Sequence, residues 1–204
     1  MKGFVVLLCG IANGLGSFEP FEIADRLNSE RSKLVANKIV NDLGGDHFIG
    51  PFTKCDANSD VRVTLNEVAE CLSQVVRLYG YPEDVTMREE KKINEIIENL
   101  QGSKWDTGMD LKDFEIFWSS YFVSFIDLVM SWFDENGDLV LSGNELTALN
   151  SFMTDSFGNM TLDSEETEVF GMIWAKYASD PTVLTLEQWI NISLVSDAFL
   201  LTRY

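Results

Sequence analysis

The chain has 204 residues and a formal net charge of −18, because 33 Asp and Glu residues face 15 Lys and Arg residues. This charge argues against nucleic acid and anionic membrane surfaces as partners and favours cations. The sequence contains one histidine, His47, which argues against a histidine-based zinc site and a Ser-His-Asp triad. Hydrophobic residues make up 46% of the chain, enough for one domain or for two small lobes packed together.

Residues 1–16 have the layout of a secretory signal peptide. The positive charge of Lys2 precedes a short apolar run from Phe4 to Ala12, and small residues follow up to Gly16. This run is too short to span a bilayer, and no other segment reaches about 18 consecutive apolar residues. We therefore expect cleavage after Gly16, with Gly14 as the alternative position, as well as secretion to the extracellular space and no transmembrane segment. The alternative is that the run forms a buried first helix or strand.

Residues 21–43 form an amphipathic stretch ahead of the first motif. Its expected buried face consists of Phe21, Ile23, Ala24, Leu27, Leu34, Ile39 and Leu43. The pairs Gly44-Gly45 and Gly50-Pro51 break the pattern that follows, so the helix leading into the first motif is expected to be short and bent.

Two segments, 56–67 and 134–145, align with each other without gaps. Both carry Asp, Asn and Asp at positions 1, 3 and 5, a hydroxyl residue at position 9 and Glu at position 12. The residues at positions 1, 3, 5, 7, 9 and 12 are Asp56, Asn58, Asp60, Arg62, Thr64 and Glu67 in one, and Asp134, Asn136, Asp138, Val140, Ser142 and Glu145 in the other. Calcium takes about six to eight oxygen ligands, which this spacing supplies if position 7 contributes its backbone carbonyl.

This pattern resembles the loops of the EF-hand family of calcium-binding proteins. The resemblance implies a helix on each side of each loop, Ca²⁺ as the bound ion, and coordination rather than catalysis. The chain departs from the family at position 6, where Val61 and Leu139 replace the preferred Gly. A left-handed backbone there costs about 1 kcal/mol or more, so we expect weaker binding or a slightly altered turn. The alternative interpretation is a pair of Asp/Asn-rich surface turns between helices.

Two further segments repeat the motif with an incomplete ligand set. Segment 102–113 has Gly at position 1 and Lys at position 3, and segment 177–188 has Gln in place of the closing carboxylate. EF-hands pair because each hand leaves an apolar face exposed, so we expect each degenerate hand to pair with the good hand before it. The architecture is similar to that of the calmodulin and sarcoplasmic calcium-binding protein families. It implies an all-α fold with one pair over 17–120 and a second over 121–204.

Cys55 and Cys71 flank the first motif. The stretch 52–71 resembles one hand of the osteonectin family of secreted matrix proteins, which also tolerates a residue other than Gly at position 6. The resemblance implies a disulfide between these two cysteines that ties the entering helix to the exit helix. Two buried free thiols are the alternative.

An aromatic-rich run follows segment 102–113 and is expected to pack in the core rather than to bind a ligand. It consists of Phe114, Phe117, Trp118, Tyr121, Phe122 and Phe125. The sequence thus predicts a secreted protein that binds about two calcium ions as an extracellular buffer or matrix component, with an extracellular protein as a further partner left open. The alternative is a sensor that exposes an apolar groove to a protein or hydrophobic ligand when calcium binds. No nucleophile arrangement supports an enzyme.

Overall fold

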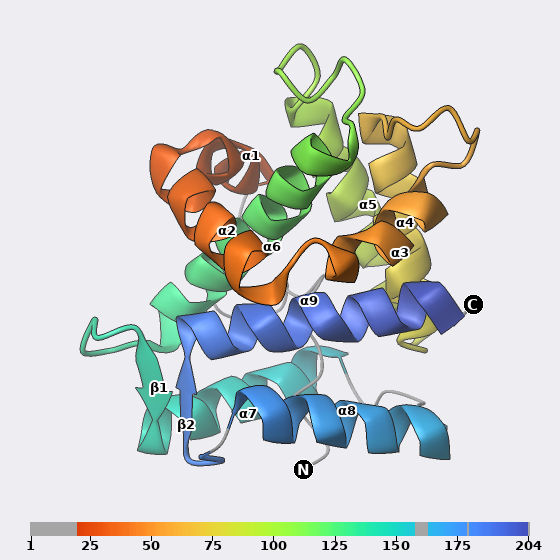
Figure 1. The fold of residues 1–204 in the computed structure, drawn as a ribbon. Coiled ribbons are helices and arrows are strands. Elements are labelled where there is room, and N and C mark those ends of the chain that lie inside the picture. Colours follow the sequence, from red (N-terminus) through yellow and green to blue (C-terminus); the bar gives the residue numbers. More distant parts are fainter. Residues whose placement is uncertain (1–19, 158–162, 179, 204) are drawn as a thin grey trace.

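The computed structural model describes residues 20–157, 163–178 and 180–203 and is mainly helical (Figure 1). The helices are α1 (Pro20–Asn28), α2 (Glu30–Leu43), α3 (Asp46–Cys55), α4 (Leu65–Leu78), α5 (Glu83–Asn99), α6 (Leu111–Phe133), α7 (Gly143–Phe157), α8 (Ser164–Tyr177) and α9 (Leu186–Arg203). Two strands, β1 (Val140–Ser142) and β2 (Val183–Thr185), pair in antiparallel fashion. The expected all-α class is confirmed at this level. The predicted signal peptide, 1–16, lies outside the described residues.

Four loops of the predicted lengths each connect two helices. We call them the first loop (56–67, between α3 and α4), the second loop (102–113, between α5 and α6), the third loop (134–145, between α6 and α7) and the fourth loop (177–188, between α8 and α9). Helix α6 leads out of the second loop and into the third. The expected border between residues 120 and 121 therefore falls inside one continuous helix, which the two halves of the protein share.

The stretch 21–43 is divided into two helices rather than one. Ser29 ends α1 and caps α2, since its hydroxyl accepts a hydrogen bond from the backbone N–H of Ser32 at 3.1 Å. This break changes which side chains face inward. Ile23, Leu27 and Ile39 are buried as expected, but the prediction for Leu34 was wrong, because its side chain is 71% exposed. The side chain of Phe21 lies outside the described residues.

Helix α3, which leads into the first loop, is short but unbroken at Gly50-Pro51. It spans 10 residues and contains Pro51 in its interior. Proline has no N–H to donate to the preceding turn, and neighbouring turns hold the helix together. The expected break at Gly44 is present, where a positive φ of 82° ends α2.

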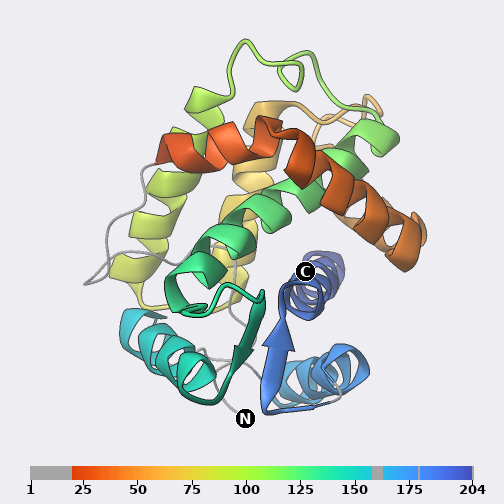
Figure 2. The ribbon, with the colours of Figure 1, turned by 90° about the vertical axis from the view of Figure 1, so that its left-hand side faces the viewer.

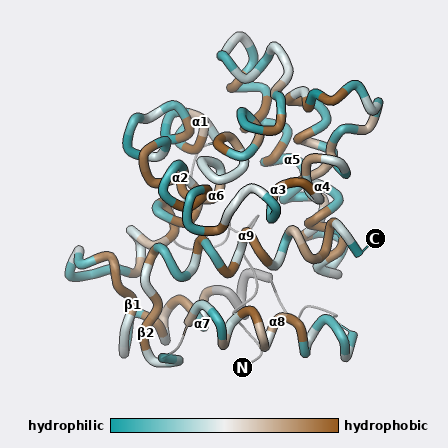
Figure 3. Tube along the Cα trace, viewed as in Figure 1, coloured by the Kyte–Doolittle hydropathy of each residue, from teal (hydrophilic) through white to brown (hydrophobic). Residues whose placement is uncertain are grey.

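The core gathers around α6 and α9. All six aromatic residues of the run that begins at Phe114 are buried, so the prediction of core packing is confirmed. Helices α1 and α2 lie on α6, and α9 crosses the molecule between the N-terminal helices and the α7–α8 layer (Figures 1 and 2). Hydrophilic residues gather in the peripheral loops, including the start of the third loop (Figure 3).

Helix α6 is long and apolar enough to cross a membrane by length and composition, the one such helix among the described residues. However, 78% of its most apolar window is buried inside the protein. A core helix at the centre of a folded domain meets the same criterion, so this helix is weak evidence for a membrane span.

Candidate metal centre

The first and third loops place the Asp and Asn side chains of the repeated motif on solvent-exposed backbone between helices. Asp56 follows the last residue of α3, and Glu67 is the third residue of α4. Asp134 likewise follows α6, and Glu145 is the third residue of α7. Apolar side chains on the flanking helices, such as Val68 of α4, are buried. The helices therefore fix both ends of each loop, and the polar residues between them stay accessible.

In the first loop, the acidic side chains fold inward onto the loop's own backbone. The Asp56 carboxylate accepts the N–H groups of Asp60 at 3.1 Å and Val61 at 2.9 Å. Asn58 Oδ1 accepts the same Asp60 N–H at 2.8 Å, and Asp60 Oδ1 accepts the N–H of Arg62 at 2.9 Å. These bonds wind the loop tightly and bring positions 1, 3 and 5 to one side of it.

The third loop has the same hydrogen bonds at the same positions. The Asp134 carboxylate accepts the N–H groups of Asp138 at 3.2 Å and Leu139 at 2.8 Å. Asn136 Oδ1 accepts from Asp138 at 2.8 Å, and Asp138 Oδ1 accepts from Val140 at 2.8 Å. Two segments far apart in the chain thus adopt the same loop conformation.

Position 6 is left-handed in both loops, although neither residue is glycine. The φ angle is 65° at Val61 and 62° at Leu139. The backbone therefore adopts the left-handed turn at position 6, and these residues bear its strain, about 1–2 kcal/mol each. Both side chains point to solvent, 70% and 43% exposed, so neither gains much burial free energy in return.

Position 12 distinguishes the two loops. The Glu145 carboxylate reaches across the third loop and accepts the N–H of Glu135 at 3.1 Å as well as that of Ser142 at 3.2 Å. The Glu67 carboxylate instead stays at the start of α4, where it accepts the Thr64 N–H and hydroxyl, both at 2.8 Å. This is a capping box. To contribute to a metal site, the Glu67 carboxylate has to give up its hydrogen bonds with Thr64 or bind the metal while it keeps them.

The oxygen donors of both loops fit a hard divalent cation. Each loop offers carboxylate, amide and hydroxyl oxygens without nitrogen or sulfur ligands, which is the set that calcium prefers. In the described ranges, no three His, Cys, Asp or Glu side chains gather closely enough to form a metal-binding group. The donors are therefore present in the right order along each loop, with the backbone amides as their present partners.

The loops associate in pairs through their eighth positions. Val63 of the first loop and Met109 of the second exchange two backbone hydrogen bonds of 2.8 Å. In the C-terminal half, Leu141 of the third loop pairs with Leu184 of the fourth in the β1–β2 ladder. All four side chains are buried. This is the register obtained by counting back from residues 113 and 188 in the sequence.

The second and fourth loops keep the structural bonds of the motif without its full ligand set. Gln188 Oε1 accepts the Thr185 N–H at 2.9 Å, as the carboxylate of Glu67 does at Thr64. In the second loop, Asp110 caps α6 by accepting the Asp113 N–H at 2.9 Å. The side chain at position 12 therefore caps the exit helix in the first and fourth loops, whereas in the second loop the cap is the side chain at position 9, Asp110.

A disulfide joins Cys55 at the end of α3 to Cys71 in α4, with an S–S distance of 2.05 Å. Both residues are buried. The bond ties the two helices that flank the first loop, as the resemblance of residues 52–71 implied. The third loop contains no cysteine, so its helices rely on packing and on the β1–β2 ladder.

Two polar contacts near the loops have no counterpart in the sequence-based prediction. The Arg62 guanidinium donates to the Gly108 carbonyl at 2.7 Å, whereas the sequence assigned a role only to the Arg62 carbonyl. The Tyr79 hydroxyl donates to Asp197 of α9, which is fully buried, and burial raises the pKa of Asp197 well above its ordinary value. Both contacts join residues far apart in the sequence, and nothing in the local sequence signals them.

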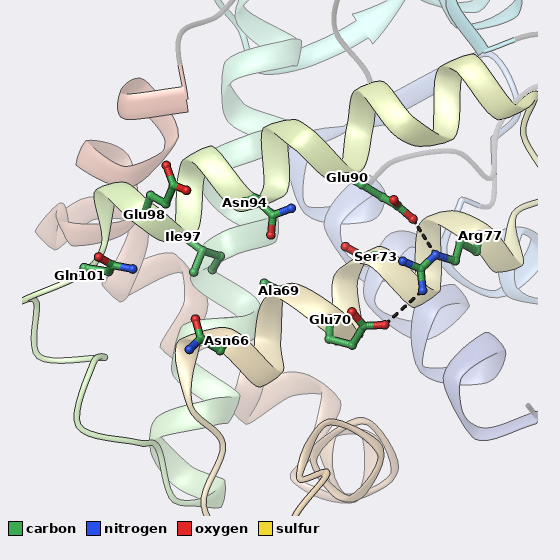
Figure 4. A pocket seen from close by; sticks show the side chains of 10 residues that line it. All are labelled: Asn66, Ala69, Glu70, Ser73, Arg77, Glu90, Asn94, Ile97, Glu98 and Gln101. Atoms are coloured by element: carbon green, nitrogen blue, oxygen red, sulfur yellow. Dashed lines mark hydrogen bonds and ion pairs between the residues drawn. The ribbon is translucent and has the colours of Figure 1, made fainter.

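A cleft of about 360 Å³ lies between α4 and α5, away from the loop donors (Figure 4). Arg77 projects across it and bonds Glu90 at 2.6 Å and Glu70 at 3.1 Å. Asn66, Asn94 and other polar side chains form most of the remaining wall. Because two of its carboxylates are paired with Arg77, this cleft lacks the free, convergent donors of a metal site.

No known family model matches the chain, and no curated protein or solved structure shows significant similarity to it.

Proposed function

We propose that the protein binds calcium through its first and third loops, as the metal-binding members of two EF-hand pairs, and acts as an extracellular calcium buffer or matrix component. The observation that carries this proposal is that the two loops share the same backbone conformation and hydrogen bonds. Each has Asp at position 1 bonded to the N–H groups of positions 5 and 6, and each has a left-handed residue at position 6. A bound calcium ion would offset the carboxylate charge that each loop gathers in a small volume.

The pairing of the loops supports an EF-hand arrangement. The first loop meets the second, and the third meets the fourth, at position 8 in each case. The degenerate loops supply the other half of each pair without a full set of ligands. This arrangement favours two bound ions rather than four.

Burial of the apolar side chains favours a buffer or matrix role over a sensor. A sensor opens an apolar groove when calcium binds, but here α1 places Ile23 and Leu27 in the core, beside α5 and α6. In the part of the chain that the structure describes, the exposed large hydrophobic residues are scattered over different elements rather than gathered in a patch. They are Leu34, Ile49, Val61, Met87, Leu139 and Met172.

Secretion is supported by the disulfide between Cys55 and Cys71, since such bonds persist mainly in oxidising compartments. The extracellular setting also suits weak sites. Extracellular hands bind calcium with a Kd of about 10⁻⁴–10⁻³ M, which is the range that we expect for at least one loop.

Calorimetric titration of the chain from residue 17 onward with calcium tests the proposal. We expect two binding events, and none in the double variant Glu67→Gln/Glu145→Gln. Gln188 shows that Gln at position 12 retains the capping bonds, so both substitutions should leave the fold intact, as circular dichroism would verify. Two bound ions in the double variant would disprove the ligand assignment. An apolar fluorescent probe should brighten no further when calcium is added, and a strong increase would instead favour a sensor.

A further inference from the structure

The contact between Arg62 and Gly108 joins the seventh position of the first loop to the seventh position of the second. Arg62 donates from its guanidinium to the Gly108 carbonyl at 2.7 Å. The side chain also lies against the glycine itself, since a Cβ placed on Gly108 would meet Arg62 Nε at 3.3 Å. The backbone of Gly108 is left-handed, with φ 82°. The Arg62 side chain therefore both hydrogen-bonds to Gly108 and packs against it.

In a calcium-binding loop of this type, the backbone carbonyl at position 7 is a ligand of the ion. Gly108 is buried, and a buried carbonyl needs a partner. In the second loop, the partner is a positively charged side chain from the neighbouring loop. The guanidinium thus supplies to this carbonyl what a cation would otherwise supply.

Two of the other oxygen donors of the second loop are engaged within the loop. Asp106 at position 5 accepts the Gly102 N–H at 3.0 Å, and Asp110 at position 9 caps α6. At position 3, the Lys104 ammonium lies 3.7 Å from the centre of the Trp105 ring. The loop is therefore closed by its own hydrogen bonds. Its three carboxylates are accompanied by two lysines of the same loop, Lys104 and Lys112, and by Arg62 from the first loop.

We propose that the Arg62 guanidinium is the built-in cation of the second loop, which holds that loop folded without a metal and excludes calcium from it. This inference rests on the proposed function in one respect, since it explains why the N-terminal pair takes one ion and not two. It makes Arg62 a residue that determines which loops are occupied. Its backbone belongs to the loop that binds the ion, and its side chain belongs to the loop that does not.

Two double variants test this proposal: Arg62→Gln/Lys104→Asn and Lys112→Gln/Lys104→Asn. Lys104→Asn gives the second loop the residue that Asn58 and Asn136 provide at position 3. Arg62→Gln and Lys112→Gln each remove one positive charge beside the same loop, and the Lys112 side chain is exposed. The two variants therefore carry the same net charge. They differ in that only Arg62→Gln frees the Gly108 carbonyl.

The first readout is titration with terbium, followed through luminescence sensitised by Trp105 within the second loop. We expect one additional ion in Arg62→Gln/Lys104→Asn and none in the Lys112 control. The second readout is amide hydrogen exchange without any metal. The amides of residues 102–108 should exchange at least about tenfold faster in the Arg62 variant only.

Equal terbium stoichiometry in the two variants would overturn the exclusion of metal by Arg62. Equal exchange rates would overturn its role in holding the loop. Both comparisons remain readable if the native chain binds no calcium at all, because the exchange measurement uses no metal and the terbium comparison is between the two variants. Failure of the proposed function and failure of this inference are therefore distinguishable.

Discussion

The first and third loops have the same backbone bonds but are held by different means. The first is constrained by the Cys55–Cys71 disulfide, by the capping box of Thr64 with Glu67, and by the Arg62 side chain on the second loop. The third has none of these. It is held by the three-residue β1–β2 ladder and by the Glu145 carboxylate, which spans the loop to the Glu135 N–H.

The third loop is also the more negatively charged of the two. The first loop contains three acidic residues and Arg62, whereas the third contains four acidic residues and no basic one. Covalent and polar constraints can hold the first loop in shape without an ion, but the third loop concentrates repulsion that a cation would relieve. Under the proposed function, the same ligand pattern is pre-organised by the surrounding fold in the first loop and depends more on the bound ion in the third.

Removal of the disulfide should have the largest effect. It takes away a constraint that the first loop has and the third loop lacks. In Cys55→Ser/Cys71→Ser, we expect the free energy of unfolding to fall by about 3 kcal/mol, since the cross-link restricts the unfolded chain. Urea titration measures this loss. Calcium binding by the first loop should weaken, because α3 and α4 are no longer tied.

The third loop is the internal control for that variant. The binding event that Glu145→Gln removes should keep its affinity when the cysteines are replaced. Equal weakening of both events would show that the disulfide stabilises the whole fold and does not organise the first loop in particular.

Single substitutions at position 12 should separate the two binding events. We expect Glu67→Gln and Glu145→Gln each to weaken one event by about a hundredfold, or about 2.7 kcal/mol, because a bidentate carboxylate is lost. Calorimetry at two ionic strengths then tests the charge difference. The event that survives in Glu67→Gln belongs to the more acidic third loop and should weaken more as salt is added. The reverse order would contradict the role assigned to charge.

Glycine at position 6 should strengthen both loops, and the first more than the third. Val61→Gly and Leu139→Gly each relieve about 1 kcal/mol of left-handed strain, and the exposed side chains forfeit little burial. Val61 is β-branched and should gain more than Leu139. Thermal unfolding and calcium titration measure these gains.

Ala57→Gly, in the same loop but without a positive φ, is the matched control. It should lower stability by about 0.5–1 kcal/mol, because it only adds freedom to the unfolded chain. A gain in this control as large as that of Val61→Gly would show that the first loop gains from flexibility and not from relief of strain.

A further effect concerns a hydrogen bond between α4 and α9. Tyr79, at the end of α4, donates to Asp197 of α9, and burial raises the pKa of this carboxyl above its ordinary value of 3.8. A raised pKa means that the folded protein holds the proton more tightly than the unfolded chain. The stabilisation from Asp197 is therefore complete below pH 3.8 and is lost as pH rises through the folded-state pKa.

Asp197→Asn retains an oxygen acceptor for Tyr79 and removes the titration. We expect the variant to gain stability relative to the native chain as pH is raised from about 4 to about 8, measured as the difference between two series of urea titrations. Asp197→Ala, which removes the acceptor, should lose stability at the acidic end. A difference between native chain and Asn variant that does not change with pH would contradict the raised pKa.

The loops and the helical character could be predicted from the sequence because they depend on local chemistry. Asp, Asn and Asp at alternate positions bond to backbone amides within a few residues, and the register of Val63 with Met109 follows from counting along the motif. Helical periodicity likewise identified buried residues such as Ile23 and Leu27. The prediction failed at Leu34, where a cap at Ser29 reset the helix, since one short polar residue can divide an amphipathic pattern.

What the sequence by itself determined is the order of donors, the turn required at position 6, and the acidic character of the chain. The tertiary structure decided the remainder. It placed Arg62 on Gly108, Tyr79 on Asp197, and α1 and α2 over α6. The physical reason is that these contacts join segments distant in the chain. Long-range packing of α6 and α9 in one core brings them together, and no local pattern encodes that approach.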